Sequence, residues 1–172
     1  MTNAKKKGNS FENKISKILG QWMFEDIHAL ARHHTSGAQK QVYCGDIIPI
    51  KQLDQFKKWN IKSFPFLIET KTGYTQFIPT IWSYTKIMEW YIKSYQESLI
   101  NNQNIIFLIC QFKNKKTIFL TNYLLDQDKV LFTSAFPIKI NGEIHYLYCY
   151  LFKELIQNDF HSLFNLKEIE KQ

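Results

Sequence analysis

The sequence predicts a single α/β domain with a central mixed β-sheet flanked by helices. Two observations support this prediction: hydrophobic periods typical of helices and of strands alternate along the first two thirds of the chain, and a meander of short strand-like segments follows. The chain of 172 residues is long enough for one hydrophobic core and short for two. Its apolar content of 45% excludes an intrinsically disordered chain.

Positive charge is concentrated in the N-terminal half of the chain. Residues 1–93 contain fourteen Lys or Arg and seven Asp or Glu, whereas residues 94–172 contain eight of each. The first half therefore carries the whole net charge of +7, which favours a polyanionic partner or an anionic surface. We expect the first eight residues, with Lys5, Lys6 and Lys7, to form a flexible basic arm that contacts phosphates or improves solubility.

A helix is predicted over residues 10–24, because apolar side chains recur there at helical spacing. The recurring residues are Phe11, Ile15, Ile18, Leu19 and Trp22. Asn9 and Glu12 have the spacing of a helix-capping pair, in which Asn replaces the usual Ser or Thr. This pair gives Glu12 a structural explanation, and a role in a functional site stays open beside it.

Residues 27–34 alternate weakly and predict a strand that leads into a Ser-Gly loop. Arg32 and Ser36 are candidates for phosphate contacts there. The adjacent His33 and His34 would point to opposite faces of a strand, so they cannot bind one metal ion together. We expect these two histidines to be polar residues at the rim.

The next two predicted strands each carry an acid. Asp46 interrupts the apolar strand 42–49, and the apolar strand 64–71 ends in Glu69 and Lys71. Side chains alternate along a strand, so Glu69 and Lys71 share one face. Charged groups at the edge of a core are costly unless they are paired or bind a metal. The two charges therefore indicate either a simple ion pair or a functional site.

The remaining elements are predicted from the same periodicities. They are a polar segment over 51–63 with Lys57, Lys58, Trp59 and Lys62, a helix over 80–100, strands over 104–112, 117–121, 130–140 and 144–148, and a short helix over 151–156. The helix 80–100 should bury Ile81, Tyr84, Met88, Tyr91, Ile92, Tyr95 and Leu99. Asn141-Gly142 is a strong hairpin signal.

The cysteines and the N-terminus indicate the compartment. Cys44, Cys110 and Cys149 are odd in number, far apart and embedded in apolar runs, which is typical of buried thiols in a reducing compartment. No segment approaches the roughly 18 apolar residues of a membrane span, and the polar N-terminus contains no signal peptide. We therefore expect a soluble cytoplasmic protein with no membrane partner.

Four short segments together resemble a known motif. They are Lys7-Gly8-Asn9-Ser10-Phe11-Glu12, Arg32 with Thr35-Ser36-Gly37, Gly45-Asp46-Ile47, and Glu69-Thr70-Lys71. Over about residues 5–112 this pattern is similar to the PD-(D/E)XK nuclease superfamily, and within it to the archaeal-type Holliday junction resolvases and their phage and viral relatives. It departs from that pattern in having Gly45 where the superfamily name has Pro, and Ala38 where such resolvases often have a second Gly. No motif is matched after residue 112.

The resemblance implies a restriction-endonuclease-like sheet and a metal-dependent site. Asp46 and Glu69 would be ligands of Mg²⁺, with Mn²⁺ as a substitute, and the Thr70 carbonyl would be a third ligand. Lys71 would orient or activate the attacking water, and Glu12 would complete the site or help to hold a second ion. The residues expected to contact DNA are Lys5, Lys6, Lys7, Arg32 and Ser36. Burial would lower the pKa of Lys71 while the carboxylates would raise it, and the sequence leaves the balance open.

The expected protein is one nuclease domain over residues 1–172, with a nuclease core over residues 9–112 and a C-terminal β extension and tail over residues 113–172. Its expected activity is Mg²⁺-dependent cleavage of branched DNA, as a Holliday junction resolvase in recombination, replication or repair. Paired cuts on opposing strands favour a homodimer. Three alternatives stay open: a restriction-like, nicking or repair endonuclease of the same fold, a non-catalytic nucleic-acid-binding module, and an unrelated α/β protein in which Glu69 and Lys71 merely pair.

Overall fold

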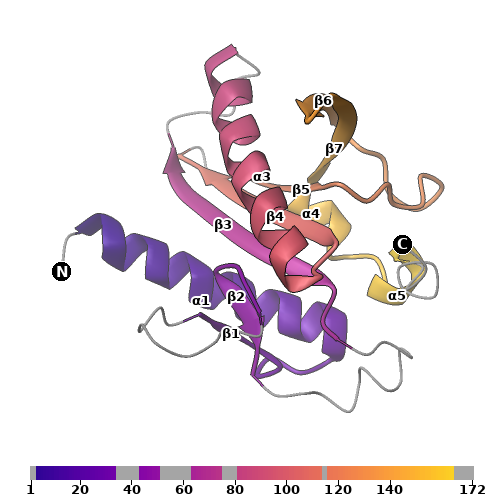
Figure 1. Ribbon diagram of the computed structural model, residues 1–172. Coiled ribbons are helices and arrows are strands. Elements are labelled where there is room, and N and C mark those ends of the chain that lie inside the picture. Colours follow the sequence, from indigo (N-terminus) through magenta and orange to yellow (C-terminus); the bar gives the residue numbers. More distant parts are fainter. Residues whose placement is uncertain (1–2, 34–42, 51–62, 75–80, 114–115, 165–172) are drawn as a thin grey trace.

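One β-sheet organises the protein, and helices lie on both of its faces (Figure 1). The computed structural model describes residues 3–33, 43–50, 63–74, 81–113 and 116–164. In chain order the elements are α1 (Asn3–Phe24), β1 (Leu30–Arg32), β2 (Ile47–Pro49), β3 (Phe66–Tyr74), α3 (Ile81–Asn101), β4 (Ile105–Phe112), β5 (Thr117–Thr121), β6 (Ser134–Ile140), β7 (Glu143–Leu151), α4 (Phe152–Leu155) and α5 (Phe160–Leu163).

The described strands form a mixed sheet in the order β1-β2-β3-β4-β5-β7-β6. β3 and β4 are parallel, and the other neighbouring strands pair antiparallel. A parallel pair needs a crossover connection, and α3 supplies it between β3 and β4. The predicted α/β domain with a mixed sheet is therefore confirmed. The predicted C-terminal meander is wrong in its strand order, because β7 lies between β5 and β6 in the sheet.

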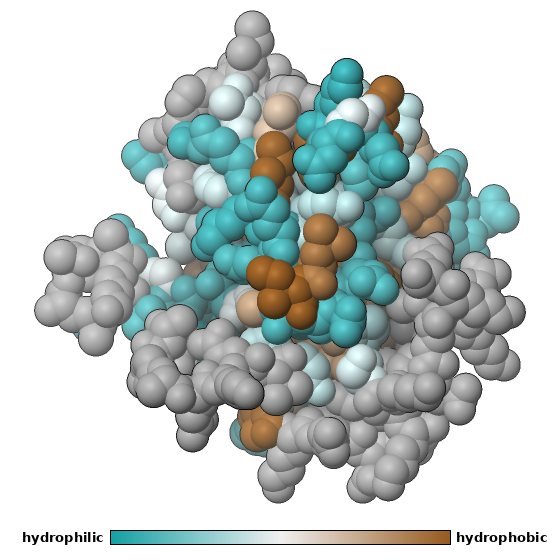
Figure 2. Space-filling view, in the orientation of Figure 1, coloured by the Kyte–Doolittle hydropathy of each residue, from teal (hydrophilic) through white to brown (hydrophobic). Residues whose placement is uncertain are grey.

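The sheet separates two hydrophobic cores. On one face, Phe66 and Ile68 of β3 pack with Phe11, Ile15 and other residues of α1. On the other face, residues of β4, β5 and β7 pack with Ile87 and Tyr91 of α3. In the view of Figure 2 the described surface outside these cores is largely hydrophilic, with small hydrophobic patches. Successive side chains of β3 therefore face different layers, and this alternation decides where its charged residues point.

The helix α1 starts earlier than the sequence predicts. It begins at Asn3, so the expectation of a flexible arm is wrong for residues 3–8, which extend the helix. Ala and Lys are strong helix formers, and the apolar stripe of α1 is anchored on the sheet from Phe11 onward. Asn9 lies inside the helix, so it is no N-cap, and the expected capping pair with Glu12 is also wrong.

The two strands before β3 are shorter than predicted. β1 covers Leu30–Arg32 instead of 27–34, and β2 covers Ile47–Pro49 instead of 42–49. The backbone before β2 turns at Gly45, whose φ is +100°, a value that a strand does not adopt. Asp46 therefore precedes β2 rather than lying within a strand.

The second half follows the prediction with several differences. β6 begins at Ser134 instead of residue 130, and β7 ends at Leu151 instead of residue 148. α3 buries Ile87 and Tyr91 as well as Ser94 and Ser98, but Leu99 is 59% exposed, so its predicted burial is wrong. The sequence analysis missed α5, which follows α4 after β7. α4 itself covers only Phe152–Leu155 of the predicted 151–156. The Asn141-Gly142 hairpin is confirmed, because both residues have positive φ, as a tight turn between β6 and β7 requires.

The expectation of buried thiols holds for two of the three cysteines, and Cys44 is half-buried. Cys44, Cys110 and Cys149 are free, and the latter two are buried. Across the described part of the chain, α1 and α3 included, we find no helix with the length and apolar character to span a bilayer.

Candidate active site

Two carboxylates from different elements converge on one ammonium group at the edge of β3. Lys71 Nζ donates a hydrogen bond of 2.7 Å to Glu69 Oε2 and lies 3.8 Å from Asp46 Oδ2. Glu69 and Lys71 pair in register with Leu108 and Cys110 of β4, so they lie on the α3 side of the sheet. Asp46 comes from the turn before β2. The structure thus brings together three of the residues that the sequence analysis singled out.

Hydrogen bonds to the backbone of β3 hold Asp46 in place. Its N–H donates to the Ile68 carbonyl at 2.8 Å, and its Oδ2 accepts from the Thr70 N–H at 2.8 Å and from Thr70 Oγ1 at 3.2 Å. The N–H and C=O of one strand residue point to the same side. The Thr70 carbonyl therefore faces the edge at which Asp46 lies.

The sequence analysis missed a buried amide that supports this turn. Gln103, which is fully buried, accepts a hydrogen bond from the Cys44 N–H at 2.7 Å and donates one to the Phe66 carbonyl at 2.6 Å. It therefore joins the turn that carries Asp46 to the start of β3. No sequence signal reveals this role, because a Gln before an apolar strand has no recognisable spacing to either partner.

His33 also supports the turn. Its N–H donates to the Asp46 carbonyl at 2.7 Å, and its Nδ1 lies 3.1 Å from the Gly45 carbonyl, with which it forms a hydrogen bond as a donor. The expectation of a polar rim residue missed this contact. His34 lies outside the described residues.

Glu12 approaches the cluster from α1. Its Oε2 lies 3.5 Å from Arg32 Nη1, which also donates to Asn9 Oδ1 at 3.0 Å. Burial raises the pKa of Glu12, and the nearby Asp46 raises it further against the attraction of Arg32 and Lys71. Glu12 therefore lies within electrostatic reach of Asp46 and Lys71, while its direct partner is Arg32.

The acids and the lysine shift each other's titration. Burial, with a contribution from Asp46, raises the pKa of Glu69 to about 7, although Lys71 opposes this. Burial lowers the pKa of Lys71, but Glu69 and Asp46 outweigh it and the pKa is raised. The sequence left open whether burial or the carboxylates would dominate the pKa of Lys71. In the structure the carboxylates dominate, so the charged form of Lys71 is favoured.

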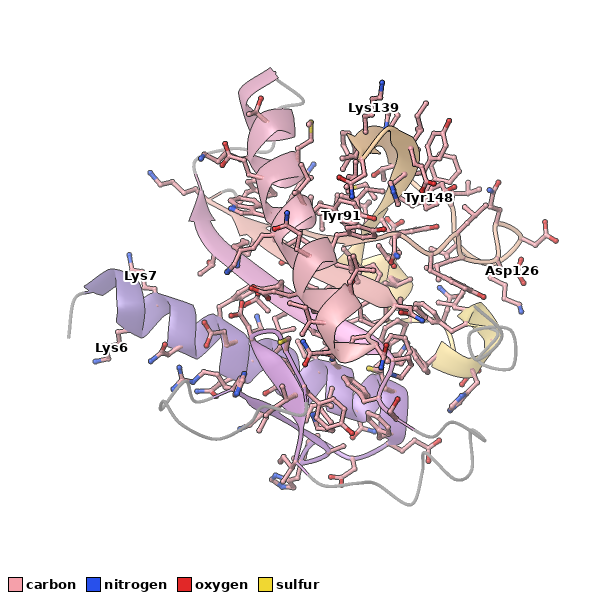
Figure 3. The ribbon with its side chains drawn as sticks, in the orientation of Figure 1. Lys6, Lys7, Tyr91, Asp126, Lys139 and Tyr148 are labelled. Carbon is pink, nitrogen blue, oxygen red and sulfur yellow. The ribbon has the colours of Figure 1, made fainter. Side chains whose placement is uncertain are left out.

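The predicted DNA contacts have different outcomes. Lys6 and Lys7 are exposed near the start of α1 and point away from the rest of the protein (Figure 3). Arg32 is half-buried against Glu12. Lys5 lies in α1, but its side chain is not described, and Ser36 lies outside the described residues. The basic segment 51–62 lies outside them as well.

The donor set suits a hard divalent cation. Asp46 Oδ2 and Glu69 Oε2 both lie within 3.8 Å of Lys71 Nζ, and the Thr70 carbonyl faces the edge at which Asp46 lies. Within the described ranges, no three His, Cys, Asp or Glu residues are grouped to hold a metal ion. Mg²⁺ does not need such a group, since it usually binds through one or two carboxylates and keeps several waters. Burial and the neighbouring Asp46 raise the pKa of Glu69 against the attraction of Lys71, and a divalent cation bound here would favour the charged form of both carboxyl groups.

An acid before a short strand, a Glu-X-Lys on the next strand and a Glu on the first helix define the class of PD-(D/E)XK nucleases. A family model described as "Phage putative PDDEXK endonuclease" matches residues 3–170, and the chain belongs to this family. The resemblance to the PD-(D/E)XK superfamily is thereby confirmed. The match also covers the segment after residue 112, in which the sequence analysis found no motif. No curated protein and no solved structure matches the chain.

Proposed function

We propose that this nuclease is a Mg²⁺-dependent endonuclease that cuts branched DNA, and specifically that it resolves Holliday junctions. The observation that carries the proposal is the convergence of Asp46 and Glu69 on Lys71. Hydrolysis of a phosphodiester requires a nucleophilic water, positive charge that compensates the phosphate, and stabilisation of the negative charge on the leaving oxygen. Acids beside a fixed ammonium, within a PD-(D/E)XK nuclease, are suited to these tasks.

Each residue has a defined task in this proposal. Asp46, Glu69 and the Thr70 carbonyl would hold Mg²⁺ or Mn²⁺, and Glu12 would complete the site or support a second ion. A bound ion supplies positive charge to the phosphate and acidifies water at neutral pH. Lys71 donates hydrogen bonds to a phosphate oxygen or to the attacking water, because its raised pKa keeps it protonated.

The oligomeric state follows from the substrate. A four-way junction is resolved by two cuts on opposing strands, so we propose a two-fold homodimer with one site in each subunit. Because the substrate is cellular or viral DNA, we propose that the protein acts in the cytoplasm. Light scattering on the purified protein, with and without a junction, measures its subunit number, and a monomer bound alone to the junction would contradict the dimer.

Cleavage of a labelled four-way junction with Mg²⁺ tests the activity. Asp46→Asn and Glu69→Gln should each reduce the rate by about a thousandfold, because loss of a metal ligand removes ~4 kcal/mol of transition-state stabilisation. Glu143→Gln is the matched control, since Glu143 is an exposed acid in the β6–β7 hairpin, and its rate should equal that of the wild type. Equal rates for all four proteins would contradict the proposal.

Competition between substrates tests the selectivity. The junction should be cut in preference to a flap, a mismatched duplex and a linear duplex of the same sequence. Equal cleavage of linear duplex would instead assign the protein to the restriction-like, nicking or repair endonucleases. Salt-dependent binding without any divalent-dependent cleavage would assign it to the non-catalytic binding modules.

Metal binding can be measured without DNA. At pH 8, MgCl₂ at about ten times its dissociation constant should raise the free energy of unfolding by ~1.4 kcal/mol, because the ion binds the folded state. Asp46→Asn should lose this stabilisation while remaining folded. Stabilisation of the variant equal to that of the wild type would place the ion elsewhere.

A further inference from the structure

Four lysines form one exposed face of α1. Lys6, Lys7, Lys14 and Lys17 are all exposed, whereas Phe11 and its apolar partners on the opposite side of the helix are buried. We call these four lysines the α1 basic face. Uncharged Ser10, Asn13 and Gln21 share it. The acid of α1, Glu12, lies on a different side and contacts Arg32.

These lysines differ from three other exposed or half-buried lysines, Lys86, Lys93 and Lys129, which have acidic partners. Three ion pairs outside α1 join a lysine to an acid nearby in the sequence: Lys86–Glu89 at 2.6 Å, Lys93–Glu97 at 3.5 Å and Lys129–Asp126 at 3.0 Å. In the part of the chain that the structure describes, no acid pairs with the α1 basic face. Its charge is therefore available to an external polyanion.

A groove between α1 and β1 continues this surface. It has a volume of about 190 Å³, and its polar lining comprises Asn13, Ser16, Lys17, His28 and Arg32. None of the residues that line it is an acid. It is smaller than the usual pocket for a drug-sized ligand, but it has room for one phosphate group with some of its water.

The groove connects the α1 basic face to the candidate active site. Arg32 lines the groove and also contacts Glu12, which is within electrostatic reach of Asp46. Lys17 lines the groove and belongs to the α1 basic face. A chain of positive groups therefore leads from the acids along the outside of α1.

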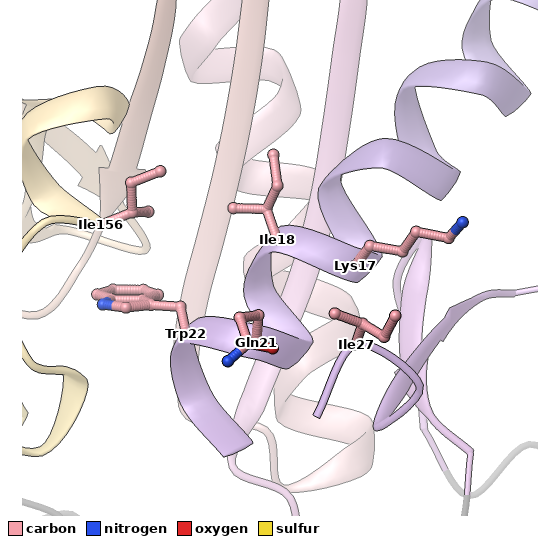
Figure 4. Close-up of a pocket in the computed structure, with 6 residues that line it drawn as sticks. All are labelled: Lys17, Ile18, Gln21, Trp22, Ile27 and Ile156. Atoms are coloured by element: carbon pink, nitrogen blue, oxygen red, sulfur yellow. The ribbon is translucent and has the colours of Figure 1, made fainter. Parts of the chain in front are cut away.

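A second hollow beside the groove has a different character. It measures about 350 Å³ and is mainly apolar, with Ile18, Trp22 and Ile156 in its lining (Figure 4). Lys17 and Ile27 line both spaces, and Lys17 is the charged residue in the lining of the hollow. A phosphate would thus find more positive charge in the groove than in the hollow.

We propose that the α1–β1 groove binds a backbone phosphate of the DNA next to the cleavage site, and that the α1 basic face binds the phosphates that follow. This inference rests on the proposed function, because it takes DNA as the substrate. Lys6 and Lys17 are eleven residues apart, which is about 16 Å of helix and the length of about five base-pair steps. Contacts of this kind recognise the phosphodiester backbone and carry no sequence information.

The salt dependence of DNA binding tests this inference. A fluorescein-labelled 30-base-pair duplex and a labelled junction are titrated with protein in EDTA, at salt concentrations from 50 to 200 mM. The double variant Lys14→Ala/Lys17→Ala should reduce the slope of log K against log salt by about 2 and weaken binding by about tenfold at the lowest salt. Lys14→Arg/Lys17→Arg should keep the wild-type slope.

The matched control is Lys86→Ala/Lys93→Ala, which removes the same charge from α3. It should leave the slope at the wild-type value, because these lysines have acidic partners. In cleavage assays, Lys14→Ala/Lys17→Ala should raise KM and leave kcat at saturating DNA unchanged.

Three outcomes would overturn the inference. If Lys14→Ala/Lys17→Ala had the wild-type slope of log K against log salt and the protein still cleaved DNA, the α1 basic face would be excluded as a DNA-binding surface. The proposed function would remain intact. An equal loss in both double variants would show a general charge effect with no defined surface. Failure of the wild type to bind either DNA would remove both the inference and the proposed function.

Discussion

Gly45 determines where the Asp46 carboxylate points. Its φ of +100° is accessible to glycine, and a Cβ at this position would lie 2.7 Å from the Ile68 carbonyl oxygen and 3.1 Å from the Ile68 nitrogen. Proline, which the superfamily name has here, is fixed near a φ of about −65° and cannot adopt this turn. The departure from the superfamily motif is therefore a requirement of the way this chain brings Asp46 to β3.

Gly45→Ala should disrupt the site. The Cβ would force the turn away from β3 and weaken the hydrogen bonds of Asp46 to Ile68 and Thr70, at a cost of about 2 kcal/mol or more in the free energy of unfolding. Mg²⁺-dependent stabilisation and junction cleavage should both fall by more than tenfold.

Gly142→Ala is the control for this substitution. Gly142 has a φ of +92°, but nothing lies within 4 Å of its added Cβ, and the hairpin is far from Asp46 in the strand order. It should lose stability from backbone strain alone and keep Mg²⁺-dependent stabilisation. If Gly45→Ala retained metal binding, the close approach of Gly45 to Ile68 would not be required for the metal site.

Glu69 should make stability depend on pH in the absence of metal. Its pKa is raised from 4.5 to about 7 on folding, so the folded state holds a proton that the unfolded state has released. Its stabilising contribution is full below pH 4.5 and is lost as the pH rises to about 7, an expected change of about 3 kcal/mol. Urea unfolding in EDTA at pH 5 and pH 8 measures this change in the free energy of unfolding.

Glu69→Gln should remove this dependence, because the amide does not titrate. At pH 8 without metal, the variant should be more stable than the wild type. MgCl₂ should reduce that difference, because it should stabilise the wild type only. Parallel pH profiles for the two proteins would show that Glu69 is an ordinary carboxylate in the folded state.

At the scale of elements, the junction between α3 and β4 positions the turn before β2. Asn102 follows α3 with a φ of +53°, and the buried Gln103 then joins the turn before β2 to the start of β3. Asn101 adds a contact of 2.8 Å from its Nδ2 to Cys44 Sγ. The crossover helix α3 therefore has a second structural role, because residues at its C-terminal end form hydrogen bonds with the turn that contains Asp46.

Gln103→Met should destabilise the protein and impair the site together. The variant keeps the side-chain volume but leaves the Cys44 N–H and the Phe66 carbonyl without their partner, which should cost about 2 to 3 kcal/mol. Mg²⁺ affinity, measured by calorimetry below the unfolding transition, should fall about tenfold as Asp46 loses its fixed position.

Gln111→Met serves as the comparison. Gln111 is half-buried on β4 and donates only a long hydrogen bond of 3.5 Å to Thr117, so its loss should cost less than about 0.5 kcal/mol. If Gln103→Met unfolds more easily but binds Mg²⁺ with unchanged affinity, Gln103 has a purely structural role.

For the whole molecule, the C-terminal segment completes the core beneath the site. Phe160 of α5 is fully buried, and its ring lies 5.0 Å from Trp22, 5.8 Å from Phe66 and 4.8 Å from Phe164. These contacts join α1, β3 and α5 in one aromatic cluster. Residues after 112 are therefore packed into the same core as the acid-bearing strand.

Phe160→Ala should destabilise the entire protein by about 3 to 5 kcal/mol through a cavity in this cluster. Unfolding followed by far-UV circular dichroism and by tryptophan fluorescence should stay a single coincident transition, as for one domain. Ile144→Ala, at a side chain that is 63% exposed, should change stability by less than about 0.5 kcal/mol. Two separate transitions in the wild type would indicate that the C-terminal segment folds as its own unit.

The elements that the sequence predicted well are those with strong local signals. β4 and β5 are largely apolar runs, β3 begins with one and continues to Tyr74 beyond its predicted end at residue 71, and Asn141-Gly142 suits positive φ at both positions, so periodicity and turn chemistry suffice to locate these elements. The boundaries of α1, β1 and β2 were less accurate. These boundaries depend on contacts with segments far away in the sequence, and a local sequence pattern does not contain that information.

The sequence by itself determined the class of this protein and the residue types at its site, because the segments that contain Glu12, Asp46 and Glu69 with Lys71 resemble the PD-(D/E)XK pattern in their order along the chain. Only the tertiary structure decided how close they lie, that Gly45, His33 and Gln103 hold the turn, and that Lys71 stays charged. Distances and pKa values depend on burial and on groups far apart along the chain. Packing sets both, and no spacing in the sequence encodes them.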